Sequence, residues 1–406
     1  MPVLLQINTV VNSGSTGRIA GDIGQIAMAN GWKSYIAFGR NERPSQSQLI
    51  KIGTDWDIKM HGLQTRLFDR HGLCSKSATQ AFMKQIEAIK PDVIHLHNIH
   101  GYYLNIEVLF NFLRISKIPV VWTLHDCWPF TGHCAHFDFV GCVKWQTQCN
   151  NCPQTRTYPA SFFIDRSKQN FQFKKELFTG VQNLTLVPVS QWLANLLGQS
   201  FLKDYPVRII NNGIDTGIFR PVSAQNIRNK FDLHSKFVLL GVANIWEVRK
   251  GLRDFIELSE KLDTNYQIIL VGLSKNQIKN LPDKIIGIEK TDSVSELAGL
   301  YAASDVFVNP TWEDNFPTTN LESMACGTPV ITYNTGGSPE AVDNETGIVV
   351  EKGNINELHD AVLKIQKNGK THYSAACKER AKHFYNKKDR FQDYIDLYEN
   401  VITKTS

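Results

Sequence analysis

The chain has 406 residues, a net charge of +5 and 42% hydrophobic residues. This length can bury large cores and predicts two domains. No apolar run reaches the roughly 20 residues that a membrane-spanning helix needs. Residues 1–7 (MPVLLQI) indicate a strand and lack the basic region and cleavage site of a secretory signal. We therefore expect a cytoplasmic protein.

The positive charge belongs to the first half of the chain. Residues 1–205 hold 20 Lys and Arg against 13 Asp and Glu, whereas the remainder holds 24 against 26. A basic first half is either an ordinary solvated surface or a face suited to an anionic membrane or a lipid diphosphate. No cluster of Lys and Arg exceeds two or three residues, which argues against nucleic-acid binding.

A Gly-rich loop joins the first predicted strand, residues 3–10, to the first predicted helix. This order is typical of the start of a Rossmann-like half. The helix N-terminus offers N–H groups to a phosphate or a carbonyl. The spacing is not the dinucleotide fingerprint, so a structural turn and a binding loop are equal alternatives. The candidates for binding are Gly14, Ser15 and Thr16.

Polar residues mark the ends of the next strands, after a strand at residues 35–39. Residues 67–79 are polar and basic, as in loops that carry function. The strand within residues 91–105 carries His95, His97 and His100, which we interpret as contacts with a substrate rather than as metal ligands. The strand at residues 119–126 ends with His125 and Asp126, where ligands bind in doubly wound sheets. We expect Asp126 to orient the imidazole of His125.

Five of the eight cysteines lie between residues 127 and 152. In a reducing compartment, a group that ends in C-x2-C favours a metal site over disulfides. The predicted ligands of a structural zinc are Cys134, Cys142, Cys149 and Cys152, because Cys127 adjoins the strand that carries His125. Intervals of seven and six residues match no common zinc finger, so free thiols are the alternative.

The second half repeats the architecture of the first. Residues 207–221 form the crossover, and residues 236–262 predict a strand, a loop and a helix. Arg249 and Lys250 stand at the junction of this loop and helix. Two cations beside helix N–H groups are suited to hold a phosphate or a diphosphate.

Residues 306–333 predict a strand, a loop, a helix and a further strand. Asp314 in the loop and Glu322 in the helix lie eight residues apart, on either side of Pro317. Two carboxylates placed in this way can accept hydrogen bonds from vicinal hydroxyls of a sugar or a ribose. A solvated acidic helix start explains the pair equally well when it is taken alone.

The whole string resembles the carboxylate pair and the LE-x-MACG-x-PVI segment of the family-4 retaining glycosyltransferases. The cysteine-rich segment is similar to that of their bacterial capsular and exopolysaccharide subgroup of the colanic-acid type. The resemblance covers nearly the whole chain and implies a GT-B fold of the α/β class, with two Rossmann-like domains facing across a cleft. Residues 1–206 would form the acceptor-side domain and residues 207–383 the nucleotide-sugar-binding domain, while the helix at 384–406 packs back on the first.

The resemblance also implies the reaction, which is transfer of a sugar from a nucleotide diphosphate sugar to a hydroxyl with retained configuration and no cofactor required for catalysis. Asp314 would touch the donor sugar, although the family has Glu at this position, and Glu322 the ribose. His125 would lie beside the sugar, and Lys250 with Arg249 would stabilise the leaving diphosphate, although the family spaces its Arg and Lys further apart. The remaining donor contacts are expected from Asn315, Phe316, Pro317 and Glu340.

The expected acceptor is a glycan or a lipid-linked oligosaccharide, with peripheral contact to the inner face of the membrane. One alternative is a non-catalytic GT-B protein that binds a nucleotide sugar, which the Asp at position 314 favours. Another is a GT-B enzyme of phosphorylated sugars, such as a sucrose-phosphate-type synthase. A phosphorylase would need a pyridoxal lysine, and no motif suggests one.

Overall fold

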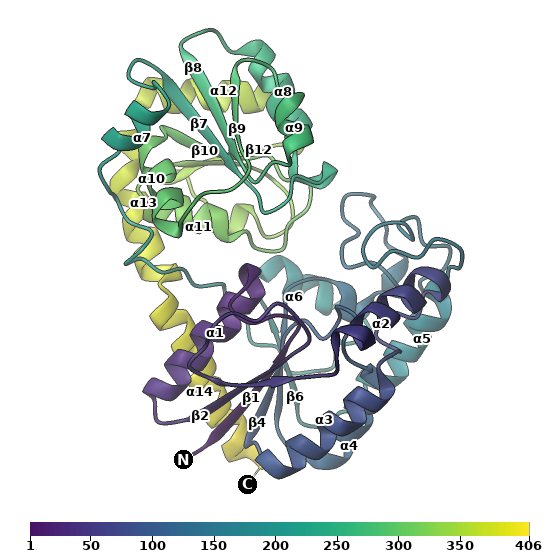
Figure 1. The fold of residues 1–406 in the computed structure, drawn as a ribbon. Helices are drawn as coiled ribbons and strands as arrows, with labels where there is room; N and C mark the ends of the chain where they lie inside the picture. The colour runs from purple at the N-terminus through teal and green to yellow at the C-terminus, as the bar shows by residue number, and fades with distance from the viewer. Residues whose placement is uncertain (406) are drawn as a thin grey trace. The chain divides into compact units, whose positions relative to one another are not determined.

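The protein, described here over residues 1–405 by a computed structural model, consists of two compact units. The first unit comprises residues 1–211 with most of the C-terminal helix, and the second comprises residues 212–387. Each unit is built around one six-stranded parallel sheet with helices packed against it (Figure 1).

The first sheet has the strand order β3-β2-β1-β4-β5-β6. This is the doubly wound order, in which the chain reverses direction across the sheet between β1 and β4. Its strands are fully buried at the centre, as β4 and β5 show, because helices cover both faces of a parallel sheet. The strands are β1 (Val3–Asn8), β2 (Lys33–Phe38), β3 (Gln48–Lys51), β4 (Val93–Leu96), β5 (Val120–Leu124) and β6 (Leu184–Pro188).

The helices of the first unit follow the strands in alternation. The helix α2 begins at a capping box, in which Thr54 and Asp57 satisfy each other's backbone N–H groups. This helix and the edge strand β3 were not among the elements that we expected from the sequence. The helices are α1 (Gly14–Ala29), α2 (Asp55–Phe68), α3 (Lys76–Ile89), α4 (Ile106–Ser116), η1 (Trp128–Phe130), η2 (Lys144–Gln146), α5 (Ser167–Phe178), α6 (Gln191–Leu197) and α14 (Lys387–Thr405).

The second sheet has the order β12-β11-β10-β7-β8-β9, which is the same doubly wound arrangement. Its reversal lies between β7 and β10, where Phe307 pairs with Leu240. Ligands in such sheets bind outside the carboxyl ends of the strands at this point. The strands are β7 (Phe237–Val242), β8 (Tyr266–Val271), β9 (Ile285–Ile288), β10 (Val306–Asn309), β11 (Val330–Tyr333) and β12 (Gly347–Val350).

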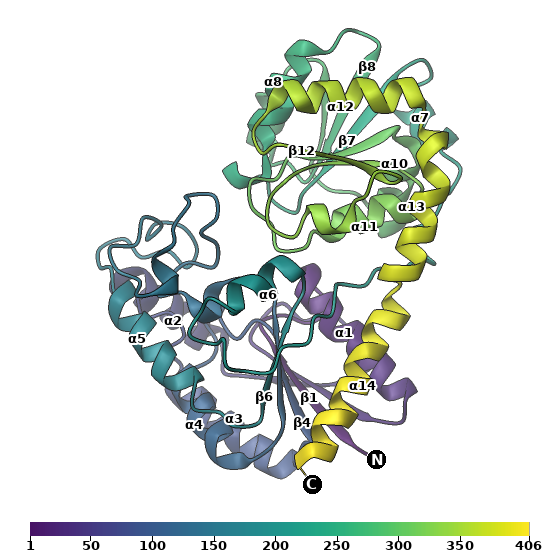
Figure 2. The ribbon, with the colours of Figure 1, turned by 180° about the vertical axis from the view of Figure 1, so that it is seen from behind.

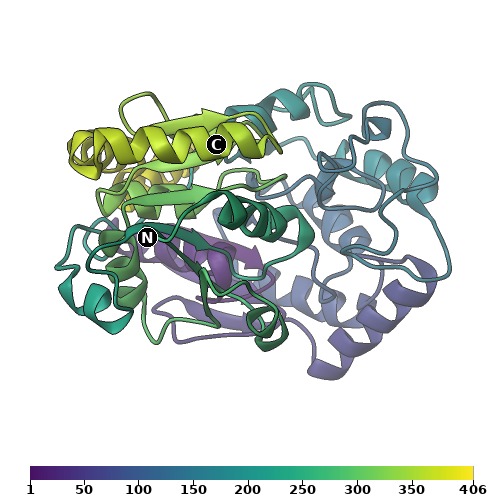
Figure 3. The same ribbon diagram turned by 90° about the horizontal axis from the view of Figure 1, so that it is seen from above.

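The longer helices of the second unit bury one apolar stripe. The helix α8 turns Phe255 and Leu258 toward the sheet, and α12 turns Leu358, Val362 and Ile365 inward. Figure 3 shows α12, in yellow-green, lying along the green strands. The helices are α7 (Gln225–Lys230), η3 (Val248–Lys250), α8 (Leu252–Lys261), α9 (Lys275–Lys279), α10 (Val294–Ala303), α11 (Thr318–Ala325), η4 (Pro339–Ala341), α12 (Ile355–Asn368) and α13 (Lys370–Tyr385).

The C-terminal helix α14 packs on the first sheet, along which it runs in Figure 2. Phe391, Tyr394 and Tyr398 join the core cluster of this unit. The hydroxyl of Thr123 donates to the hydroxyl oxygen of Tyr394 at 3.0 Å, and it accepts a hydrogen bond from Nε2 of His95 at 2.7 Å. Nδ1 of His95 therefore accepts from the hydroxyl of Tyr398 at 2.6 Å. This buried chain of hydrogen bonds fixes the helix on the strands.

The bond between Tyr398 and His95 gives a stability prediction. The Tyr398→Phe substitution leaves Nδ1 of His95 buried without a donor, which we expect to lower the free energy of unfolding by about 1–3 kcal/mol. Tyr266→Phe is the matched control, because it removes an exposed hydroxyl bond to Gln366 and should cost less than about 1 kcal/mol. Urea unfolding followed by circular dichroism measures both, and equal losses would contradict the anchoring role.

Candidate functional site

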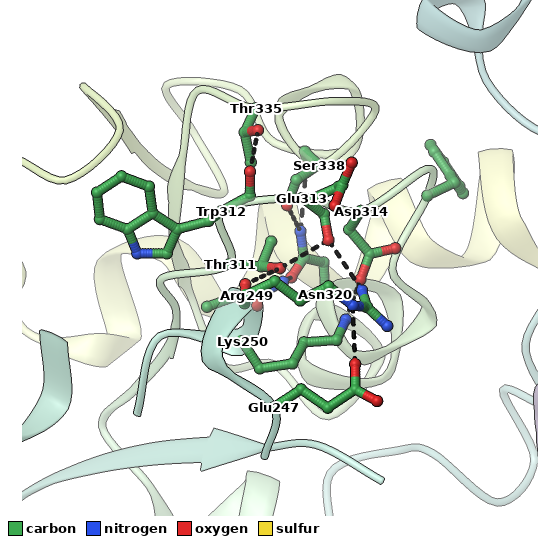
Figure 4. Close-up of polar contacts among 12 residues, drawn as sticks. Glu247, Arg249, Lys250, Thr311, Trp312, Glu313, Asp314, Asn320, Thr335 and Ser338 are labelled. Carbon is green, nitrogen blue, oxygen red and sulfur yellow. Dashed lines mark hydrogen bonds and ion pairs between the residues drawn. The ribbon is translucent and has the colours of Figure 1, made fainter. Parts of the chain in front are cut away.

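A cluster of charged side chains lies over the reversal point of the second sheet. The loop after β7 ends in η3, which carries Arg249 and Lys250, and the loop after β10 carries Asp314. Because β7 and β10 are hydrogen-bonded neighbours, the two loops emerge side by side at the carboxyl ends of the strands. Figure 4 shows the cation of Lys250 directed at the carboxylate of Asp314.

The ion pair between Lys250 and Asp314 is short and partly buried. Nζ of Lys250 lies 2.5 Å from Oδ2 of Asp314, and the side chains are 22% and 19% exposed. Arg249 donates from Nη1 to the carbonyl oxygen of Glu313 at 3.1 Å and from Nε to Glu247 at 3.0 Å. The structure thus brings together three of the four residues that we expected to be catalytic, two cations and one carboxylate.

Backbone contacts hold these two loops against each other. Trp312 donates its backbone N–H to the carbonyl oxygen of Arg249 at 2.8 Å. Gly251 has a φ of +77°, and an added Cβ would lie 2.1 Å from the carbonyl oxygen of Pro310. No side chain fits such a left-handed and crowded position. The approach of the two loops therefore depends on a glycine directly after Lys250.

A buried carboxylate in α8 forms hydrogen bonds that hold the loop after β10 in place. Asp254 accepts hydrogen bonds from the indole of Trp312 at 2.9 Å and from the hydroxyl of Tyr333 at 2.6 Å. Burial raises the pKa of this carboxyl above its ordinary value, although both hydrogen bonds oppose the rise. Sequence reasoning missed Asp254, whose position in a helix just after the cation pair was the only available signal.

A third loop, which follows β11, packs against the backbone of Asp314. Gly337 donates its N–H to the carbonyl oxygen of Asp314 at 3.1 Å, and a Cβ at Gly336 would lie 1.9 Å from that oxygen. Ser338 receives hydrogen bonds from the amide of Asn320, which lies in α11. Asn320 and Ser338 appear beside Asp314 in Figure 4 and had not been expected from the sequence.

The other expected donor contacts lie along the segment between Asp314 and α11. Asn315 and Phe316 are buried, and Pro317 is the residue before the helix. The ring of Phe316 packs against Tyr385 with a centroid distance of 5.8 Å. Its carbonyl oxygen accepts a hydrogen bond from the amide of Asn212 at 3.1 Å. The side chain of Phe316 is thus part of the packing that fixes the loop.

The two expected glutamates stand further along the chain. Glu322 lies in α11 with 5% exposure, and its carboxylate accepts a hydrogen bond from the hydroxyl of Tyr301 at 3.1 Å. Glu340 lies in η4, and its carbonyl oxygen accepts from Arg380 at 3.3 Å. The polar environment of Glu322 is compatible with a buried carboxylate that also receives hydroxyl groups.

In the first unit, His125 belongs to a chain of hydrogen bonds rather than to a pair with Asp126. Nε2 of His97 donates to Oε1 of Gln6 at 3.0 Å, so Nδ1 of His97 accepts from Nε2 of His125 at 3.2 Å. Burial lowers the pKa of His125 to about 4, although Asp126 opposes this. His125 is therefore neutral and carries its proton on Nε2.

The expectation that Asp126 orients His125 was therefore wrong. Asp126 accepts a hydrogen bond from Nε2 of His100 at 2.8 Å and another from the backbone N–H of Trp128 at 2.9 Å. The strand β4 places His100 in the loop beside Asp126, and both groups are largely buried. The hydrogen-bond partner of Asp126 is therefore set by the neighbouring strand β4, and not by the residue next to it in the sequence.

The interpretation of His95 and His97 as substrate contacts is also corrected. Their side chains are 0% and 1% exposed, and their ring nitrogens bond to groups within the core of the unit. Their rings lie 3.9 Å apart, because residues two positions apart in a strand point to the same face. They are structural side chains of the sheet.

The Gly-rich loop forms the turn between β1 and α1. Gly14 is the first residue of the helix with a φ of +62°, and Ser15 and Thr16 follow it in the first turn. The N–H of Asn12 donates to the carbonyl oxygen of Gly17 at 3.0 Å, which tightens the turn. These residues lie at the carboxyl end of β1, in the first unit.

The expected structural zinc is not supported. Cys134, Cys142, Cys149 and Cys152 line one small pocket together with Phe137 and Trp145, and all are free thiols. Within residues 1–405, however, no three His, Cys, Asp or Glu side chains are placed to hold a metal ion. Burial raises the pKa of Cys149 to about 11, which favours its thiol form. In the structure these four cysteines are free thiols, which was the alternative to a zinc site.

None of the helices in the described part of the chain is long and apolar enough to cross a membrane. The charged cluster of the second unit and the polar loops of the first both stand at carboxyl ends of parallel strands. Two α/β units of identical doubly wound order, each with polar loops at these ends, define a protein of the Rossmann-like class.

Comparison with known proteins identifies the family. Residues 29–217 match the family described as Glycosyltransferase Family 4, and residues 236–368 match Glycosyl transferases group 1. The chain belongs to these glycosyltransferases, and the expected α/β fold of the GT-B type is confirmed.

Relatives and solved structures agree with this assignment. The chain is 25% identical to the putative colanic acid biosynthesis glycosyl transferase WcaC of Escherichia coli K12, over 98% of this chain and 100% of that protein. It is 22% identical to the D-inositol 3-phosphate glycosyltransferase of Corynebacterium jeikeium, over 81% and 78%. The fold resembles sucrose-phosphate synthase from Thermosynechococcus elongatus, with a TM-score of 0.74, 18% identity and 100% coverage of both chains. It also resembles Anabaena Alr3699/HepE in complex with UDP-glucose, with a TM-score of 0.70, 14% identity and coverage of 98% and 100%.

The buried imidazoles of the first unit predict a loss of stability in acid. Burial lowers the pKa of His61 to about 3 and of His125 to about 4, and it holds the pKa of His71, His95 and His97 well below the ordinary range. Below pH 6.5 the unfolded chain therefore binds more protons than the folded chain, and the free energy of unfolding falls.

Each such imidazole contributes up to about 1.4 kcal/mol per pH unit between its folded and unfolded pKa values. Urea unfolding at pH 7.5 and pH 5 should show a lower midpoint at pH 5. A midpoint that stays constant or rises on acidification would contradict the neutral, buried state of these side chains.

Proposed function

We propose that this glycosyltransferase moves a sugar from a nucleotide diphosphate sugar to a hydroxyl of a growing surface polysaccharide, with retention of the anomeric configuration. The observation that carries the proposal is the pair of Lys250 and Asp314 at the reversal point of the second sheet, with Arg249 beside it. Cations at this point suit a diphosphate, and a carboxylate next to them suits the hydroxyls of the attached sugar.

In the proposed reaction, the bond between the anomeric carbon and the diphosphate oxygen breaks, and a bond from the same carbon to the acceptor oxygen forms on the same face. The proton of the acceptor hydroxyl passes to an oxygen of the departing diphosphate. Negative charge grows on that diphosphate in the transition state. Lys250 and Arg249 stabilise it there more than in the ground state, which lowers the barrier.

The ion pair between Lys250 and Asp314 allows Lys250 to change its anionic partner during the proposed reaction. In the absence of donor, the ammonium of Lys250 is neutralised by Asp314. A bound diphosphate offers Lys250 a second anionic partner, and Asp314 then accepts hydrogen bonds from sugar hydroxyls. The backbone bonds of Gly337 and Trp312 keep both loops in place during this change.

The nucleotide is assigned to the second unit, with Glu322 as acceptor for the ribose hydroxyls. Support comes from its burial beside Tyr301 and from the UDP and UDP-glucose complexes of Alr3699/HepE. The similarity to a colanic acid glycosyl transferase favours a polysaccharide acceptor, which we assign as lipid-linked.

A non-catalytic protein that binds a nucleotide sugar is the second candidate. The shorter Asp314, engaged with Lys250, is the observation that favours it. The two candidates agree on binding and differ in turnover, so that release of free nucleotide from a donor sugar separates them.

The Lys250→Met variant tests the role of the cation. We expect turnover to fall by about a hundredfold or more, because a charge that stabilises the leaving group is lost. Arg253→Met is the matched control, since Arg253 is 90% exposed and pairs with Glu257 at the surface. Nucleotide release from a panel of nucleotide sugars, with a lipid-linked acceptor, measures both. Wild-type protein that binds nucleotide without releasing it from any donor would favour the second candidate.

The Glu322→Gln variant tests the ribose contact. Replacing a charged acceptor by a neutral amide of the same shape should weaken nucleotide binding about tenfold or more, because hydrogen bonds to charged groups are the stronger ones. Glu345→Gln, at an exposed position of the same unit, is the control. Calorimetric titration with nucleoside diphosphates gives the affinities, and equal values for both variants would remove Glu322 from the site.

A further inference from the structure

Two cysteines of the first unit are hydrogen-bonded to each other, although they lie 18 residues apart in the chain. Cys134 and Cys152 line one pocket together with Cys142, Cys149 and Trp145. The thiol of Cys134 donates a hydrogen bond to the sulfur of Cys152, and both are free cysteines. Two sulfurs in such contact need only small side-chain rotations to reach the geometry of a disulfide.

Cys152 has the features of a reactive thiol. It is partly exposed, so a small solute can reach its sulfur. The hydrogen bond from Cys134 lowers the pKa of Cys152 to about 7 against the opposing effect of burial, and the backbone N–H of Gln154 also donates to this sulfur. The thiolate is the nucleophilic form of cysteine, so oxidation selects thiols that are accessible and have a low pKa.

Cys134 has the opposite character, which suits the second thiol of a pair. Its side chain is buried, with 6% exposure. The hydrogen bond to Cys152, together with burial, raises the pKa of Cys134 well above its ordinary value. Cys134 is therefore a neutral thiol whose S–H group points at the sulfur of Cys152. This is the position from which a second cysteine condenses with an oxidised first one.

The surroundings hold the two sulfurs in contact. The backbone N–H of Cys152 donates to Oδ2 of Asp165 at 2.7 Å, and the hydroxyl of Thr131 donates to the carbonyl oxygen of Cys134 at 2.5 Å. The imidazole of His133 also lowers the pKa of Cys152, and the opposite effect of the Asp165 carboxylate is smaller. Both arms of the cysteine-rich segment are thus fixed by contacts of their own.

We infer that Cys134 and Cys152 form a reversible redox site, in which a peroxide converts the two thiols into a disulfide. The thiolate of Cys152 attacks one oxygen of hydrogen peroxide, the O–O bond breaks, and Cys152 becomes a sulfenic acid while hydroxide leaves. The sulfur of Cys134 then attacks the sulfur of Cys152. The S–S bond forms, and the sulfenic hydroxyl group leaves as water with the proton of the Cys134 thiol. The two sulfurs together lose two electrons, which reduce one peroxide to water and hydroxide.

The disulfide connects the segment after β5 to the end of the cysteine-rich region. The backbone N–H of Cys127 donates to the carbonyl oxygen of Ala135 at 2.9 Å, so the arm that carries Cys134 is bonded to the residues that follow His125 and Asp126. Oxidation therefore restrains this loop by a crosslink between residues 134 and 152. The redox chemistry involves these two side chains alone, and it does not depend on the proposed function.

Peroxide treatment of the full chain tests the site. Reduced protein is exposed to hydrogen peroxide, the remaining thiols are blocked with N-ethylmaleimide, and the links are located by tandem mass spectrometry of the peptides. We expect the wild-type protein to lose two reactive thiols and to show a disulfide between Cys134 and Cys152. Dithiothreitol should restore both thiols, because a disulfide is reduced by thiol exchange whereas sulfinic and sulfonic acids are not.

Two variants separate the roles of the thiols. Cys152→Ser should abolish the loss of thiols at this pair. Cys134→Ser should leave a sulfenic acid at Cys152 that dimedone labels, because the second thiol is missing. Cys142→Ser is the matched control, since Cys142 lines the same pocket and is also partly exposed. Its rate of disulfide formation should stay within about twofold of the wild-type rate, as its thiol takes no part in the exchange.

Several outcomes overturn the inference. They are wild-type protein that keeps all its thiols in millimolar peroxide, thiols that react only after treatment with a chelator, and a disulfide that joins another pair of cysteines. Equal effects of Cys142→Ser and Cys152→Ser would also contradict it. Circular dichroism of the reduced variants shows whether they fold, and the location of the disulfide in the wild-type protein is read without them.

Discussion

The ion pair between Lys250 and Asp314 is the interaction on which the site of the second unit depends. It joins the two loops that leave β7 and β10, the neighbouring strands at the reversal of the sheet. The glycines at 251 and 336 let the surrounding backbone come close enough for the pair to form. Since both partners are about one-fifth exposed, solvent screening is incomplete and a ligand can still reach them. The pair thus keeps a cation and a carboxylate ready at one point without burying either.

The sequence allowed the fold class and the charged cluster to be predicted for a common reason. Each strand of these sheets is a short apolar run, and each is followed by a polar loop and an amphipathic helix, so that local pattern and topology coincide. Lys250 and Asp314 could be singled out because both stand in the loops that follow such strands. The assignment of Glu322 and His125 to particular ligands depended on family resemblance, and their roles stay predictions.

Contacts between distant segments could not be read in this way. The partner of Asp126 is His100 and that of His125 is His97, because β4 and β5 are neighbours in the sheet and their ends meet. Strand order decides such pairs, and periodicity carries no information about it. The same limit applies to the cysteines. Their spacing suggested a zinc site, but in the structure they line one pocket as free thiols. Arg40 and Arg66 are 26 residues apart in the chain, yet each lies near the ring of Tyr102, with Cζ at 5.8 Å and 5.7 Å from its centroid.

The two units satisfy their cations differently. In the second unit Lys250 has a carboxylate of its own chain, so a diphosphate there has to compete with Asp314. In the first unit neither Arg40 nor Arg66 forms an ion pair within the described residues, and Nε of Arg40 is buried there without a hydrogen-bond partner. A paired cation can exchange partners during a reaction, whereas an unpaired one gains most from simple binding. A cation that can exchange its carboxylate for a diphosphate therefore suits the reaction proposed for the second unit.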